Sequence, residues 1–389
     1  MPPALSVRRV TLTNFRSYAG ATIETDGRPV VLAGANGIGK TNLLDAISLL
    51  SPGRGLRGAR LSEHVRRGPS ASDTPLWAVA ATVARDGETY EIGTGLAHTP
   101  SGSERRLVRM NGAPAQSSAD LAEIVQMLWL TPAMDRLFIE GASGRRRFLD
   151  RLVLGFEPVH ARTSTRYETA MRERARLLKF GPRDPAWLDG LEAEMSETGI
   201  AIAAARASTV ARLNEALSQR RSAGSFPCAQ LSLTGDADAW LLDGDIIEAQ
   251  TLLRERLVQL RTRDAESGRT SVGPHLSDLA VRHTEKRTDA RECSTGEQKA
   301  LLVSIVLADA WELAARNRGL CPVLLLDEIA AHLDAKRRVA LFEEILAIRA
   351  QAWMTGTDAT LFSDLAGSAE MFTVDDGRFL PCVDAGTPQ

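Results

Sequence analysis

Eight residues, GANGIGKT at positions 34–41, restrict the possible folds of this chain more than any other stretch. The apolar run VVLA, typical of a buried strand, comes directly before them, and leucines at helical spacing follow. A strand, this loop and a helix together match the phosphate-binding pattern G-x-x-x-x-G-K-[ST]. In that pattern backbone N–H groups surround an anion, Lys40 reaches the β- and γ-phosphates, and the Thr41 hydroxyl ligates Mg²⁺. The expected nucleotide-binding residues are Gly34, Ala35, Asn36, Gly37, Ile38, Gly39, Lys40 and Thr41.

A second apolar run, VLLL at 323–326, ends in two acidic residues. Asp327 follows this expected strand at its carboxyl end, where the corresponding aspartate of phosphate-loop NTPases holds Mg²⁺. Glu328 would orient the attacking water. Taken alone, an acidic pair after a strand is more often a simple turn, but the glycine-rich loop gives this pair a chemical role. We therefore interpret Lys40, Asp327 and Glu328 as candidate catalytic residues, and Thr41 and Asp327 as the Mg²⁺ ligands.

The stretch CSTGEQKA at 293–300 places small polar residues and a glycine just before a helical pattern. One interpretation is a helix cap, in which Ser294 or the threonine after it accepts from backbone N–H groups and Glu297 or Gln298 completes a capping box. A capped helix start is also an anion site. The expected helix, 297–316, is about 30 Å long, whereas the following strand runs back only about 20 Å. We therefore expect Ser294 to pass its own chain's nucleotide and to face a neighbouring molecule.

The hydrophobic pattern divides the chain into three segments. Residues 1–144 carry the phosphate loop and short strand-like runs with Asp-Gly and Asn-Gly turns, which predict an antiparallel flank. Residues 145–267 show helical spacing interrupted by prolines and no lasting heptad, which predicts a compact helical arm. Residues 268–389 alternate helices and strands, as in a mainly parallel sheet. We expect an α/β fold in which the first and third segments form one domain and the arm is an insertion.

The charge of the chain is balanced, because 47 lysines and arginines against 49 aspartates and glutamates give a net charge of −2. No global positive field is therefore available to attract nucleic acid. All but five of the basic residues are arginine, so an arginine cluster by itself is weak evidence for a binding site.

The four cysteines lie far apart, which suggests neither a zinc site nor a disulfide framework. No apolar run approaches the ~20 residues that span a bilayer, and we expect a cytoplasmic protein with no membrane partner.

Local positive surfaces are expected in two places. Three consecutive arginines at 145–147 stand next to a helix start, and the stretch 162–179 has six basic residues against two acidic ones. Such side chains bind DNA phosphates in a salt-dependent, sequence-independent manner. Because arginine is abundant throughout, the alternative that these residues only solvate a helix face stays open. The candidate DNA contacts are Arg145, Arg146, Arg147, Arg172 and Arg176.

Taken in order, these motifs resemble the ABC-type phosphate-loop ATPase heads of the SMC-like group, and most closely the bacterial RecF family. The similarity covers nearly the whole chain. Besides the three nucleotide motifs, it includes NFRSY at 14–18, EGASGRRRFLD at 140–150 and GPHLSDL at 273–279. In the last segment an arginine and an aspartate of the family pattern are replaced, so only His275 and Asp278 carry over.

The resemblance implies an ATPase head that dimerises with ATP between the subunits. Ser294 and Gly296 would contact the γ-phosphate held by Lys40 of a second copy, and Asp334 would lie in a loop that faces the dimer. RecF-like proteins bind DNA near single-strand gaps, so gapped, duplex or single-stranded DNA is the implied ligand. They act with RecO and RecR to load the RecA recombinase in recombinational repair and replication restart. The implied cofactors are ATP and Mg²⁺, with slow, DNA-stimulated hydrolysis serving as a switch.

Three other classes of protein share the phosphate-loop pattern. The energy-coupling ATPase of a transporter is the main alternative, but transporter heads carry a glycine where Glu297 stands and a switch histidine where this chain has Thr355-Gly356-Thr357. A chromosome-organising SMC protein needs far longer arms than ~120 inserted residues can build at 1.5 Å per residue. The third class is a nucleotide kinase or a GTPase, of which the GTPase is disfavoured because the chain has no Asn-Lys-x-Asp motif. The glutamine loop of ABC-type heads has no clear register here, with Gln126 as its nearest candidate.

Overall fold

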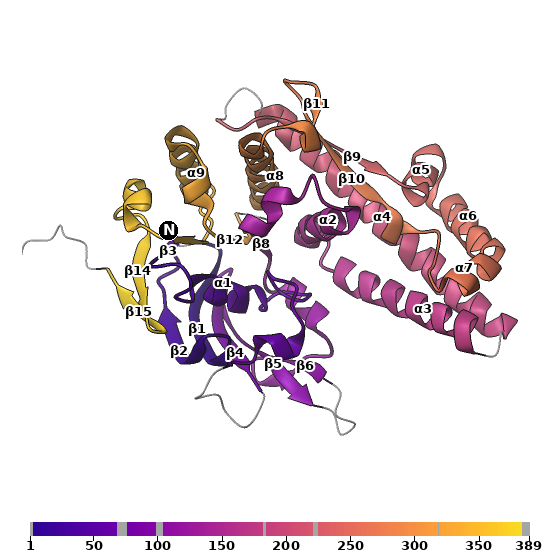
Figure 1. Ribbon diagram of the computed structural model, residues 1–389, viewed down its shortest axis with the longest axis horizontal. Helices are drawn as coiled ribbons and strands as arrows, with labels where there is room; N and C mark the ends of the chain where they lie inside the picture. The colour runs from indigo at the N-terminus through magenta and orange to yellow at the C-terminus, as the bar shows by residue number, and fades with distance from the viewer. Residues whose placement is uncertain are drawn as a thin grey trace, which may run out of the picture. The chain divides into compact units, whose positions relative to one another are not determined.

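The computed structural model of the protein describes residues 3–67, 76–98, 104–181, 184–220, 225–317 and 319–382 (Figure 1). The chain divides into two compact units. Unit 1 comprises Met1–Asp135, Ala223–Phe226 and Leu302–Gln389, and unit 2 comprises Arg136–Ser222 and Pro227–Leu301. Residues 268–301, which the sequence pattern groups with the third segment, thus lie with the arm in unit 2. The three-segment division itself stays a prediction.

The described part of unit 1 contains a mainly parallel sheet in the order β15 (Arg378–Pro381), β14 (Glu370–Asp375), β3 (Val30–Ala33), β13 (Ala352–Gly356), β12 (Val323–Leu326) and β8 (Met127–Leu130). Neighbouring strands run parallel except β14 and β15, which form an antiparallel pair. Strand β3, which leads into the glycine-rich loop, lies between β13 and β14. All residues of β3 and β12 are buried, as in the inner strands of a parallel sheet.

A second sheet of unit 1 is antiparallel, in the order β2 (Tyr18–Glu24), β1 (Leu5–Phe15), β4 (Ala78–Arg85), β5 (Glu88–His98), β6 (Glu104–Met110) and β7 (Ala113–Pro114). It is the antiparallel flank that the sequence predicts. The turn from β4 to β5 and the turn from β6 to β7 use Asp86-Gly87 and Asn111-Gly112, and all four residues have a positive φ. The expected combination of a mainly parallel sheet with an antiparallel flank is confirmed.

Helix α1 (Lys40–Ser48) joins the two sheets of unit 1 through one buried cluster. Leu43 and Ile47 of this helix are fully buried together with Val10 and Phe15 of β1 and Leu325 of β12. The helix thereby connects the glycine-rich loop rigidly to both sheets. The other long helices of unit 1 are α9 (Ala335–Ala347) and the greater part of α8 (Thr295–Arg316).

Short 3-10 helices occur in both units. They lie at Leu61–His64, Ser118–Glu123, Pro132–Arg136, Pro274–Leu276, Ala290–Glu292, Ile329–His332 and Ala359–Leu365.

Unit 2 is mainly helical, as the sequence predicts, but it also contains a small antiparallel sheet. Its strands are ordered β11 (Thr288–Asp289), β10 (Asp278–His283) and β9 (Ala229–Thr234). The sequence analysis did not foresee β9, which interrupts the predicted helical segment. The helices are α2 (Ala142–Phe156), α3 (His160–Phe180), α4 (Pro185–Arg220), α5 (Asp236–Asp243), α6 (Ile246–Gln259) and α7 (Arg261–Ser267).

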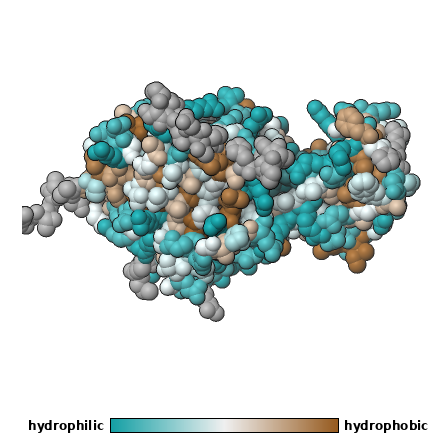
Figure 2. All heavy atoms as spheres, turned by 90° about the horizontal axis from the view of Figure 1, so that it is seen from below, coloured by the Kyte–Doolittle hydropathy of each residue, from teal (hydrophilic) through white to brown (hydrophobic). Residues whose placement is uncertain are grey.

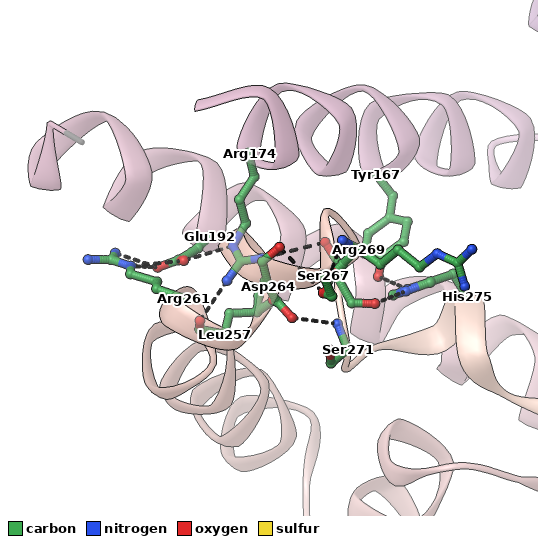
Figure 3. A network of polar contacts seen from close by, with 11 residues as sticks. Tyr167, Arg174, Glu192, Leu257, Arg261, Asp264, Ser267, Arg269, Ser271 and His275 are labelled. Atoms are coloured by element: carbon green, nitrogen blue, oxygen red, sulfur yellow. Dashed lines mark hydrogen bonds and ion pairs between the residues drawn. The ribbon is translucent and has the colours of Figure 1, made fainter. Parts of the chain in front are cut away.

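A buried network of charged side chains holds these helices together (Figure 3). Arg174 of α3 is fully buried, and its guanidinium pairs with Glu192 of α4 at 2.8 Å and with Asp264 of α7 at 2.7 Å. It also donates to the carbonyl of Leu257 in α6 at 2.7 Å. Arg261 adds a second guanidinium to Glu192. Four helices are therefore fixed to one arginine, because a buried charge must keep all its partners.

The surface is largely hydrophilic on the face drawn in Figure 2, where hydrophobic side chains occur in smaller groups among polar ones. No helix in the described ranges is both long and apolar enough to cross a bilayer.

Candidate nucleotide-binding site

The glycine-rich loop leaves the carboxyl end of β3 and enters α1 with a backbone that requires glycine. Gly34 and Gly39 have φ values of 151° and 118°, which residues with a side chain rarely adopt. A Cβ at Gly39 would also lie only 2.8 Å from the Tyr18 hydroxyl oxygen. No side chain in the described residues caps the start of α1. The first N–H groups of this helix and its dipole are therefore available to an anion.

Lys40 is the first residue of α1 and lies inside the curve of the loop. The residue is 4% exposed, and its ammonium donates to the carbonyls of Gly34 at 2.7 Å and Ala35 at 2.9 Å. Burial lowers the pKa of Lys40, and the carboxylates of Glu328 and Asp327 partly oppose this effect. The positive charge of the ammonium is thus already in position between the loop and the two acidic residues, where it can bind the oxygens of a phosphate chain.

Asp327 follows β12 and meets the loop across the edge of the parallel sheet. The Thr41 hydroxyl donates to its carboxylate, with Oγ1 2.8 Å from Oδ1 and 3.1 Å from Oδ2. The Thr355 hydroxyl at the end of β13 donates to the same Oδ1 at 2.8 Å. A threonine hydroxyl beside an aspartate carboxylate is a set of hard oxygen donors that suits Mg²⁺. The structure therefore brings the adjacent Lys40 and Thr41 together with Asp327, which lies 286 residues after Thr41.

Glu328 adopts an unusual backbone conformation. Its φ of 51° and ψ of 26° place it in the left-handed region, which costs a residue with a side chain about 1–3 kcal/mol. Its backbone N–H donates to the Thr355 hydroxyl at 2.9 Å. Strain of this kind persists only where the surroundings hold the residue, and it concentrates at functional sites. The position beside Asp327 therefore suits a residue with a chemical role.

The NFRSY segment supports the loop from the antiparallel sheet. The Tyr18 hydroxyl donates to the carbonyl of Gly39 at 3.0 Å, and burial raises the pKa of this tyrosine. Arg16 pairs with the buried Asp45 of α1 at 2.6 Å. Burial alone would raise the pKa of Asp45, but the His64 ring, 3.5 Å away, and the charge of Arg16 outweigh burial and lower it. Sequence reasoning identified this segment only by resemblance and assigned no role to its side chains.

The start of α8 belongs to unit 2. The helix begins at Thr295, two residues earlier than predicted. The Glu297 carboxylate accepts the backbone N–H of Ser294 at 3.0 Å, which is half of the predicted capping box. An ion pair with Lys286 and this backbone bond lower the pKa of Glu297 to about 2. Ser294, Thr295 and Gly296 are exposed, and beyond its chain neighbours and its own helix backbone a Cβ built on Gly296 would meet no atom of the described residues within 4 Å.

Asp334 precedes α9 and is exposed. Its carboxylate accepts the backbone N–H of Arg337 at 2.9 Å, so it is the N-cap of that helix. The capping bond fixes the carboxylate without burying it. A contact with a second molecule therefore remains a prediction for Asp334.

The candidate DNA-binding arginines differ in how far they are already engaged. Arg145 forms a bidentate pair with Asp278 at 2.7 and 2.8 Å and also donates to three backbone carbonyls of residues 137–140. Its contacts stabilise unit 2, because a phosphate contact would break some of these bonds. Arg146 donates to the carbonyl of Ser277 at 2.8 Å. The side chains that stay exposed are those of Arg147, Arg172 and Arg176.

The GPHLSDL segment is also part of the internal framework of unit 2. Arg206 pairs with Asp150 at 2.8 Å and donates to the carbonyl of Pro274 at 2.7 Å, which joins this segment to the RRRFLD segment. The half-buried His275 has its Nδ1 2.7 Å from the Tyr167 hydroxyl oxygen (Figure 3). His275 and Asp278 thus both have partners within unit 2 and are only partly exposed. Of the basic residues at 162–179, Arg174 is fully buried and therefore adds nothing to a surface charge.

Comparisons with known proteins agree with this fold. A family model for the RecF/RecN/SMC N terminal domain matches residues 6–378. The solved structure of the recombination mediator protein RecF-ATP in RecFOR pathway superposes with a TM-score of 0.81 at 23% identity, over 98% of this chain and 99% of that one. The SmcHead bound to the C-winged helix domain of ScpA reaches 0.54 at 15% identity, over 97% of each chain. The fold is therefore that of an SMC-type ATPase head.

Sequence relatives narrow the class to one family. The DNA replication and repair protein RecF of Mesorhizobium japonicum is 48% identical over 385 residues, which are 99% of this chain and 100% of the relative. The RecF of Agrobacterium fabrum is 49% identical over 377 residues, 97% of this chain and 99% of the relative. The chain belongs to the RecF family of DNA replication and repair proteins. The transporter alternative finds no support in these matches.

Proposed function

We propose that this protein is an ATP-dependent DNA-binding protein of recombinational repair and replication restart. It acts near single-strand gaps and helps RecO and RecR to load RecA. The observation that carries the proposal is the placement of Lys40, Thr41 and Asp327 around one glycine-rich loop. Support for the biological setting comes from the relatives named DNA replication and repair proteins and from the fold of RecF-ATP in RecFOR pathway.

The residues of unit 1 would act on ATP in distinct ways. The N–H groups at the start of α1 bind the phosphate oxygens, and Lys40 compensates the charge of the β- and γ-phosphates. Thr41 and Asp327 would hold Mg²⁺, which supplies electrostatic stabilisation of the transferred phosphoryl group. Glu328 orients a water molecule for attack and accepts its proton. Hydrolysis is slow and ends the ATP-bound state rather than driving mechanical work.

The start of α8 would complete the ATP site of a second copy. Ser294 and Gly296 are exposed at a helix start, so their N–H groups and the serine hydroxyl can approach a γ-phosphate from outside. ATP then lies between two copies. The more tightly ATP binds the dimer, the more it stabilises the dimer. The affinity for DNA then depends on whether the protein is a dimer. The exposed Arg147, Arg172 and Arg176 are the remaining candidates for contacts with DNA phosphates.

Changing Ser294 to arginine is expected to separate ATP binding from dimerisation. The arginine adds bulk and charge at the surface that meets the second copy, while the phosphate loop of unit 1 stays intact. The affinity of the monomer for ATP should remain within about twofold, and the ATP-dependent dimer should be lost in sedimentation velocity runs. Ser218→Arg, at an exposed serine of α4, is the matched control and should dimerise normally. Dimerisation of the Ser294→Arg protein with ATP would disprove the composite site.

Changing Glu328 to glutamine tests the proposed function most directly. The amide keeps the shape of the side chain but cannot accept the proton of the attacking water, so turnover should fall about 100-fold or more. ATP binding should persist, and the dimer should remain on DNA. The measurements are phosphate release and co-sedimentation with gapped, duplex and single-stranded DNA, each with and without ATP. Glu343→Gln, at an exposed carboxylate of α9, should leave both unchanged. ATP-independent retention of the Glu328→Gln protein on DNA would contradict the switch.

A further inference from the structure

Thr355 lies beside the two acidic residues of the candidate site. It lies near the carboxyl end of β13 and is fully buried. Its hydroxyl donates to Asp327 Oδ1 at 2.8 Å and accepts the backbone N–H of Glu328 at 2.9 Å. One hydroxyl therefore contacts both acidic residues. The sequence analysis noted this position only because ABC transporters carry a histidine in the segment 355–357.

The two bonds fix the direction of the hydroxyl proton. A hydroxyl has one proton to donate and two lone pairs to accept with. The N–H of Glu328 can only donate, so the Thr355 oxygen must accept from it and its own proton must point to Asp327. The Thr41 hydroxyl, at the start of helix α1, donates to the same Oδ1. The carboxylate of Asp327 is thus held between two hydroxyl groups in a single orientation.

The bond to Glu328 has a second effect, on the backbone. Glu328 is in the left-handed conformation, and its N–H lies next to a fully buried side chain. A buried N–H without a partner is unfavourable, so loss of the Thr355 oxygen would favour a different backbone at this point. A shift of about 1 Å in a group that orients a reactant can reduce its effect about 100-fold.

We infer that Thr355 is a positioning residue for the ATP site: its hydroxyl orients the Mg²⁺-binding carboxylate of Asp327 and fixes the backbone that carries Glu328. This inference rests on the proposed function for its chemical meaning. The two hydrogen bonds of its hydroxyl go to Asp327 and to the backbone of Glu328. It acts only through the two acidic residues.

A simpler explanation is that threonine is present because β-branched residues suit a buried strand. The two explanations predict different results for valine, which has the same shape and suits strands equally well but has no hydroxyl. If only the strand matters, Thr355→Val is neutral and serine, which is not β-branched, is the worse substitute. If the hydroxyl matters, serine replaces threonine and valine does not.

The test compares Thr355→Val with Thr355→Ser in the full chain. The first readout needs no nucleotide: hydrogen exchange of the peptide that contains the Glu328 amide should be at least about tenfold faster in the valine variant and near native in the serine variant. The second readout is the affinity for a fluorescent ATP analogue with and without Mg²⁺. In the valine variant we expect the affinity without Mg²⁺ to stay within about twofold, and the tightening by Mg²⁺ and the turnover to fall roughly tenfold or more.

Thr209→Val is the matched control, because Thr209 is equally buried and its hydroxyl has no hydrogen-bond partner among the described residues. It should match the native protein in every readout. The inference is overturned if the valine variant exchanges and binds Mg²⁺-ATP like the native protein, or if the serine variant fails as the valine variant does. If the native protein binds no ATP, the proposed function fails, whereas the exchange of the Glu328 amide still decides whether Thr355 holds this backbone.

Discussion

Replacing Lys40 by alanine is expected to weaken ATP binding at least about 100-fold, because hydrogen bonds to charged groups contribute up to about 3 kcal/mol and the lysine serves two phosphates. The fold should survive this change. The ammonium is buried against backbone carbonyls, and burial already lowers its pKa, so its removal relieves a desolvation cost. Titration of a fluorescent ATP analogue measures the affinity, and thermal unfolding without nucleotide measures the stability.

Lys336→Ala serves as the control for this experiment, since Lys336 is an exposed lysine of α9 in the same unit. It should bind ATP like the native protein. ATP should also raise the melting temperature of the native protein and of this control, but not that of the Lys40→Ala protein. If the Lys40→Ala protein bound ATP as tightly as the native protein, the phosphate loop would not be the ATP-binding site.

Replacing Arg174 by alanine should produce the largest loss of stability, about 3–5 kcal/mol, as expected when one member of a buried ion-pair network is removed. Asp264 bears most of this cost, because it is buried and loses the guanidinium, whereas Glu192 keeps Arg261. Urea unfolding followed by circular dichroism measures the loss. Hydrogen exchange in α3, α4 and α7 shows whether the loss is localised to unit 2.

The matched control is Arg172→Ala, two residues away on the same helix. Arg172 is exposed and donates only to the Thr169 side chain among the contacts observed, at 3.2 Å. Its removal should change the free energy of unfolding by no more than about 0.5 kcal/mol. Equal midpoints for the Arg174→Ala and Arg172→Ala proteins would show that the buried network contributes nothing to stability.

The local chemistry of the candidate site could be predicted from the sequence, because each part of it lies within a few residues of a strand end. A glycine-rich turn, a lysine and a threonine are adjacent in the chain, and parallel strands bring their carboxyl ends to one edge of the sheet. The meeting of Thr41 with Asp327 follows from these two facts. The contacts of Thr355 with Asp327 and Glu328 could not be predicted, because a short run of residues does not show which strand pairs with β12.

Interactions over long sequence distances account for most of what sequence analysis missed. Whether an arginine is a surface charge or a core residue depends on its partners: Asp264 for Arg174 and Asp278 for Arg145 lie 90 and 133 residues away. Helical periodicity cannot reveal such pairs. Strand β9 was missed for a related reason, since its only neighbour in the described residues, β10, comes from a distant part of the chain.

The position of β3 in its sheet has a consequence for the synthesis of the protein. Its hydrogen-bonding neighbours are residues 352–356 and 370–375, so a growing chain carries this apolar strand without either of them for most of its translation. At about 5–20 residues per second, that interval lasts on the order of tens of seconds. The unpaired apolar strand is therefore a natural substrate for chaperones until those residues leave the ribosome.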